Sequence, residues 1–151
     1  MLLQVFRALI GSFAGTLGFA ALIHTPRKAA VPAAALGAGA YMVYWVLLQL
    51  GLSDAASVFA GALLGSLCAQ LMARRLHIIS TVFVLLSIVA AVPGLGLYRF
   101  MELLGAGQTG SAGSVGAAAM TSILMIALGI ACGSMLDRVF HKMKKGRDSH
   151  A

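Results

Sequence analysis

The chain has 151 residues, of which 60% are hydrophobic and only 10% are charged. A soluble domain carries roughly 25% charged residues and could not bury so much apolar surface at this size, so the composition excludes a soluble globular protein. The net charge of +7 predicts contact with anionic lipid head groups. It does not predict nucleic-acid binding, because the basic residues are not interleaved with aromatic residues and no nucleic-acid motif is present.

Apolar stretches of about 20 residues, the length that an α-helix needs to cross a bilayer, alternate with short basic clusters. They predict an all-α membrane bundle with five spans, over residues 2–23, 29–50, 55–73, 78–104 and 117–136. The transmembrane domain therefore covers residues 1–136, and residues 137–151 form a basic tail. A tight turn is expected over residues 51–54, and a flexible loop rich in glycine, alanine and serine over residues 105–116.

The basic residues predict the orientation in the membrane. All Lys and Arg except Arg7 and Arg99, nine of the eleven, follow the first, third and fifth spans. Five spans place these three segments on one face, which the positive-inside rule assigns to the cytoplasm. We therefore expect a cytoplasmic C-terminus and an N-terminus outside the cell.

The fourth predicted span is interrupted by proline and glycine. Proline removes a backbone N–H and clashes with the preceding turn, so the helix should break here. Transporters use broken helices to hold anionic groups and ions at free helix ends. The residues predicted to bind substrate lie at and after this break: Pro93, Gly94, Gly96, Tyr98, Arg99 and Glu102. The alternative is a proline kink without a role in transport.

Arg99 and Glu102 are three residues apart, so they could pair on one helix face. Ionisable groups within a span usually face a cavity or a partner. Alternatively, this part of the helix lies at the outer surface, where water solvates both side chains. The same alternative applies to Arg7, whose side chain could reach the outer face.

Three Gly-x-x-x-Gly motifs have the spacing that lets membrane helices approach closely. The glycines predicted to pack helices are Gly11, Gly15, Gly61, Gly65, Gly129 and Gly133. Either these faces pack only within the chain, or at least one packs against another subunit. Leucine at Gly61 or Gly65 should then disrupt a complex.

The sequence offers little for catalysis, metal binding or cofactors, and we expect neither an enzyme nor a cofactor. Asp54 lies at a turn and Asp137 at a helix end, so an intramembrane aspartyl protease is not indicated. Cys68 and Cys132 lie in apolar segments without metal-ligand spacing, and we expect them to be small buried residues.

The order of these features resembles the small subunit (ThrE/YjjB type) of the threonine/serine exporter-like family. The resemblance covers residues 10–136. It rests on Gly18-Phe19-Ala20 followed by the His24–Lys28 turn, on residues 59–65, and on Pro93-Gly94 with Tyr98.

The resemblance implies a multi-pass protein of the bacterial inner membrane that exports threonine and serine, or dicarboxylates such as succinate. Long members of the family fuse two halves, and this chain resembles one half, so a larger membrane subunit is the implied partner. A second copy of the chain is a further candidate partner. Two rival functions stay open: a structural subunit that stabilises a partner without contacting substrate, and a channel-like pore.

Overall fold

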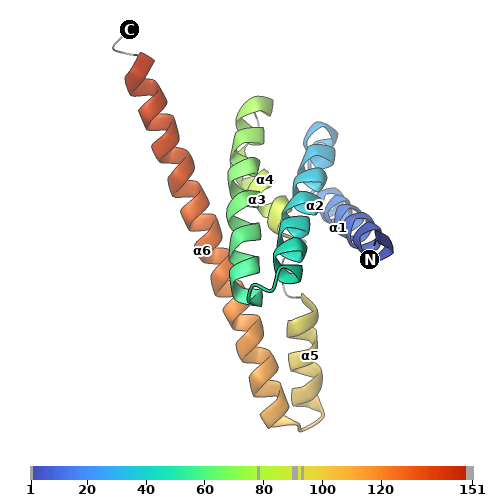
Figure 1. The fold of residues 1–151 in the computed structure, drawn as a ribbon. Coiled ribbons are helices and arrows are strands. Elements are labelled where there is room, and N and C mark those ends of the chain that lie inside the picture. The colour runs from blue at the N-terminus through green and yellow to red at the C-terminus, as the bar shows by residue number, and fades with distance from the viewer. Residues whose placement is uncertain (1, 78, 90–91, 93, 149–151) are drawn as a thin grey trace.

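The computed structural model describes residues 2–77, 79–89, 92 and 94–148, and its regular structure within these ranges is entirely helical (Figure 1). The helices are α1 (Leu2–Leu22), α2 (Arg27–Gln49), α3 (Asp54–Leu76), α4 (Ser80–Val89), α5 (Gly94–Gly105) and α6 (Thr109–Asp148). The predicted all-α membrane fold is confirmed.

Within the described residues, three helices are long and apolar enough to cross a membrane: Lys28–Gln49, Asp54–Leu76 and Thr109–Phe140. The pair α4 and α5 forms a fourth span if its two parts, bent by 57°, are counted together. This break matches the interruption predicted in the fourth span. The first predicted span corresponds to α1, whose apolar helix Leu9–Leu22 is shorter than the other candidates.

Helices α2 and α3 form an antiparallel hairpin through a short turn. Gly51 has a φ of +85°, which favours glycine, and the Ser53 hydroxyl caps α3 by accepting from the Ala56 N–H at 3.4 Å. Gly61 and Gly65 of α3 lie against α2. A Cβ added at Gly61 would lie 3.1 Å from the Ala40 carbonyl oxygen, and one at Gly65 would lie 3.0 Å from the Ala40 Cβ. This motif therefore packs against α2 within the chain, and a subunit contact at Gly61 and Gly65 stays a prediction.

Helix α6 lies on α3 through its own glycine motif. A Cβ at Gly129 would lie 2.8 Å from both the Phe59 carbonyl oxygen and the Ala62 Cβ, closer than real Cβ atoms approach. A Cβ at Gly133 would lie 3.1 Å from the Leu63 carbonyl oxygen. Because no hydrophobic effect joins helices in lipid, such close approach is what stabilises the pair. Gly129 and Gly133 thus also pack against a helix of the same chain.

Polar contacts show that α3 and α6 run parallel. At one end, Asp54 accepts hydrogen bonds from the Tyr44 hydroxyl at 2.9 Å and the Ser122 hydroxyl at 3.3 Å. At the other end, Arg74 of α3 pairs with Asp137 of α6. Among the residues whose side chains the structure describes, this is the only ion pair.

The predicted loop over residues 105–116 is wrong for most of its length, because α6 begins at Thr109. Phe100 of α5 covers Gly116, where a Cβ would lie 2.8 Å from its ring. Ala112, Gly116 and Ala119 form a buried stripe at helical spacing. Small residues that suggest a loop in a soluble protein instead permit close helix packing in a membrane. Figure 1 shows α5 beside the first part of α6, beyond the end of α2 and α3.

Two further features differ from expectation. Helix α6 has 40 residues, about 60 Å, and continues past the predicted boundary between residues 136 and 137. Cys68 and Cys132 are free and exposed rather than buried. They lie on the outward sides of α3 and α6, where apolar residues can face lipid.

The three basic clusters lie at one end of the bundle, so the side of the membrane on which this end lies can be tested. The Arg74–Asp137 pair brings the end of α3 to Arg138, and the antiparallel α2 begins at Arg27 near the same end. We predict that this end is cytoplasmic. A reporter that is active only in the cytoplasm should work when fused after Ala151. Activity of a periplasmic reporter alone at that position would invert the topology.

Candidate functional site

Helix α1 packs against α2 and α4 at a point where small side chains permit close contact. Gly37 of α2 is buried there, and a Cβ at Gly37 would lie 2.8 Å from the Thr16 Oγ1 and 3.1 Å from the Leu86 carbonyl oxygen. Thr16 is only 1% exposed, and its hydroxyl donates to the Ser12 carbonyl oxygen at 2.8 Å. Ala20, one turn further along α1, is buried in a hydrophobic core that includes Phe83 and Leu86.

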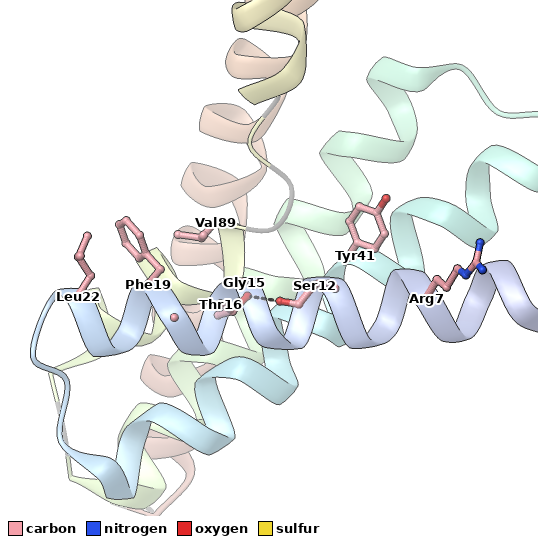
Figure 2. A pocket seen from close by; sticks show the side chains of 10 residues that line it. Arg7, Ser12, Gly15, Thr16, Phe19, Leu22, Tyr41 and Val89 are labelled. Atoms are coloured by element: carbon pink, nitrogen blue, oxygen red, sulfur yellow. Dashed lines mark hydrogen bonds between the residues drawn. The ribbon is translucent and has the colours of Figure 1, made fainter.

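Next to this contact lies a cleft of about 630 Å³ (Figure 2). It runs along α1 and is bordered by one residue of α2 and the last residue of α4. The residues that line it are Arg7, Gly11, Ser12, Gly15, Thr16, Gly18, Phe19, Leu22, Tyr41 and Val89.

The glycines of α1 keep this cleft open. Among the described residues, nothing lies within 4 Å of a Cβ added at Gly11, Gly15 or Gly18. This motif therefore differs from the other two, whose glycines meet a neighbouring helix. A helix face without side chains leaves space for a solute or for another helix. The prediction of a subunit contact stays a prediction for Gly11 and Gly15.

The lining has a polar part and an apolar part. Arg7 and Tyr41 point to the same side of α1 in Figure 2, while Phe19, Leu22 and Val89 lie toward the other end. In the described structure the Ser12 hydroxyl is buried and lacks a hydrogen-bond partner. This hydroxyl is not accessible from the cleft in this structure. The arrangement suits a small solute with an anionic group near Arg7.

The cleft meets the broken helix, but not through the predicted residues. Val89 ends α4, so the cleft borders the start of the break. Pro93 lies outside the described residues. Gly94, Gly96, Tyr98, Arg99 and Glu102 belong to α5, and none of them lines the cleft.

The two charged residues of α5 lie as expected for the alternative of a solvated helix face. Arg99 and Glu102 are exposed and, in the described part of the chain, do not form an ion pair. Tyr98 is 65% exposed. Tyr98, Arg99 and Glu102 are thus accessible to solvent, lipid or a partner. A role for these residues in substrate binding stays a prediction.

The sequence does not by itself single out the α1 face as a candidate binding surface. From the sequence, Arg7 faces either a cavity or the outer surface, and the glycine motif is predicted to pack a helix. The overlooked signal was Ser12 and Thr16, four residues apart and interleaved with Gly11 and Gly15 in an apolar span. Polar side chains on a glycine-rich helix face indicate a cavity as readily as a helix contact.

Comparison with known proteins places the chain in a family. The family model described as "Threonine/Serine exporter, ThrE" matches residues 8–136, which is most of the chain. No curated protein matches the chain, and no solved structure does. The matched family is one of transporters and not of enzymes. The chain therefore belongs to the threonine/serine exporter family and is a multi-pass membrane protein.

Proposed function

We propose that this chain is one subunit of a secondary exporter in the bacterial inner membrane, and that it acts with a larger membrane subunit. Its substrates would be threonine and serine, with dicarboxylates such as succinate as the other candidate class. The observation that carries the proposal is the cleft on α1, which combines glycines, hydroxyl groups and one cation beside a broken helix.

The size and chemistry of the cleft support a small polar substrate. Ligand sites commonly occupy about 300–1,000 Å³ and are mostly apolar with a few polar groups that orient the ligand. The cleft of about 630 Å³ fits this description. Arg7 would attract a carboxylate, and Tyr41 would bind a hydroxyl or backbone-like polar group. Phe19 and Val89 would contact a methyl group such as that of threonine.

The coupling ion would have to be bound elsewhere. Among the described residues, the cleft lining includes Arg7 but no carboxylate. Proton-coupled transporters commonly use Asp, Glu or His within the membrane. Coupling would therefore occur outside the cleft, and we propose that the larger subunit provides it. That subunit itself is inferred from the resemblance, because this chain resembles one half of the long family members.

A structural role is the second candidate. The face of α5 formed by Leu95, Tyr98 and Met101 is exposed, and each of these side chains is 65% exposed. Such a face would suit a contact with the larger subunit. In this case the chain would stabilise its partner and would not contact substrate.

Efflux measurements test the proposed function. Cells loaded with labelled threonine should export it when this chain and its partner are both present, and not when either is produced alone. Efflux is normalised to the amount of each subunit in the membrane. If the partner alone, at unchanged level, exports at the full rate, this chain has no transport function. If the partner alone exports less only because less of it is present in the membrane, the structural role is correct.

A further inference from the structure

A second cavity lies at the basic end of the bundle, away from the cleft on α1. It has a volume of about 370 Å³, and we refer to it as the vestibule. The residues that line it come from α3, α4, α6 and the turn between α3 and α4: Gln70, Ala73, Arg74, His77, Ser80 and Asp137. The cleft and the vestibule share no lining residue. The proposed function therefore does not use the vestibule.

The vestibule contains a cation and an anion side by side. Asp137 is 7% exposed and pairs with Arg74, whose side chain is 40% exposed. A buried ion pair adds little stability, because desolvation of both charges offsets their attraction. Stability alone therefore does not account for a charge pair at this position.

The surrounding structure holds both charges in place. The Gln70 side chain donates to the Ser66 hydroxyl of its own helix and the Ser134 hydroxyl of α6, each at 3.4 Å. Gly133 brings the helices together one turn before Asp137. His77 ends α3 with a φ of +54°, so the chain turns here toward Ser80 of α4. The two charges thus sit on packed helices, as a selective site requires.

We infer that the vestibule binds the zwitterionic head of an α-amino acid, with the carboxylate on Arg74 and the ammonium group on Asp137. This inference rests on the proposed function and specifies its substrate class. The existing ion pair need not break. Arg74 uses Nη2 and Asp137 uses Oδ2 for their pairing, while a guanidinium has five N–H donors and a carboxylate has two oxygens. The other N–H groups of Arg74 match the carboxylate of the amino acid, and the other oxygen of Asp137 matches its ammonium group. Ser80 and His77 add polar groups for a side-chain hydroxyl.

The same arrangement disfavours a dicarboxylate. Succinate could place one carboxylate on Arg74, but its second carboxylate would lie near the negative charge of Asp137. Like charges close together are repulsive, and the repulsion is stronger in a partly buried site than in water. The vestibule therefore favours threonine and serine over succinate.

A ligand series tests this inference without requiring a variant to fold. The purified 151-residue chain is titrated with threonine, with 3-hydroxybutyrate, which lacks the ammonium group, and with threoninol, which lacks the carboxylate. Threonine should bind at least about tenfold more tightly than either analogue, because each analogue leaves one charge unmatched. Succinate should not compete. Equal affinity for all three ligands would overturn the inference.

Two variants then locate the binding. Asp137→Asn should weaken threonine binding at least about tenfold and leave 3-hydroxybutyrate unchanged. Arg74→Gln should weaken threonine binding similarly and leave threoninol unchanged. Arg75→Gln is the matched control, since Arg75 is exposed and does not line the vestibule. It should alter none of these affinities.

The outcomes separate this inference from the proposed function. If both variants weaken threonine and its analogues by the same factor, the ion pair only holds α3 and α6 together. If both variants leave threonine binding intact, the amino acid binds elsewhere, for example in the cleft. Either result overturns the inference while threonine efflux from the wild type still supports the exporter. If the wild-type protein neither exports nor binds threonine, both the inference and the proposed function are overturned.

Discussion

Replacing Gly15 with leucine should reduce threonine efflux at least about tenfold while leaving the amount of protein in the membrane unchanged. Gly15 lines the cleft, and among the described residues nothing lies within 4 Å of a Cβ placed there. The leucine side chain would therefore enter empty space and occupy the volume that we assign to substrate. It should not displace a neighbouring helix. The measurement is efflux of labelled threonine, normalised to membrane protein level.

Gly39→Leu is the matched control for this change. Gly39 is an exposed glycine within α2, a Cβ there also meets nothing within 4 Å in the described structure, and it does not line the cleft. Equal efflux for the two variants would contradict a substrate path along α1. Complex size in mild detergent separates the alternatives: a complex that dissociates in Gly15→Leu would identify the Gly11 and Gly15 face as a subunit contact.

Much of the fold follows from the sequence because lipid imposes a simple rule. Every backbone group in the hydrocarbon layer must be satisfied internally, so apolar runs of about 20 residues become helices. This rule predicts α2, α3 and most of α6, and the proline-glycine pair predicts the separation of α4 from α5. It fails over residues 109–116 because glycine and serine favour loops in water, whereas in this chain they form a surface against Phe100.

The candidate sites were less predictable than the helices, because the same Gly-x-x-x-Gly motif lies in different environments in the fold. Spacing alone does not distinguish Gly15, which faces an open cleft, from Gly65, which meets Ala40. The difference depends on which helix lies opposite, and that is a property of the tertiary arrangement. The pairing of Arg74 with Asp137 likewise joins residues 63 positions apart in the sequence. No local pattern relates them, so the vestibule could not be predicted.

The glycines that do meet a neighbouring helix should be intolerant even of a methyl group. Gly129→Ala would place a Cβ 2.8 Å from the Phe59 carbonyl oxygen and 3.0 Å from the Leu63 backbone nitrogen. Neither backbone atom can move away without shifting α3 from α6. We expect the free energy of unfolding to fall by about 1–3 kcal/mol, the usual cost of overpacking. Equilibrium unfolding in mixed detergent micelles measures the change.

Gly113→Ala on the same helix is the control. Gly113 is exposed, and in the described part of the chain nothing lies within 4 Å of a Cβ added there. Alanine favours a helix over glycine by up to about 1 kcal/mol, so this variant should be as stable as the wild type or slightly more stable. Gly129→Ala gains the same helix preference, and any loss of stability therefore measures the collision with α3 alone. If both variants were equally stable, α3 and α6 could not approach as closely as Gly129 indicates. The Arg74–Asp137 pair would then lack the rigid support on which the vestibule depends.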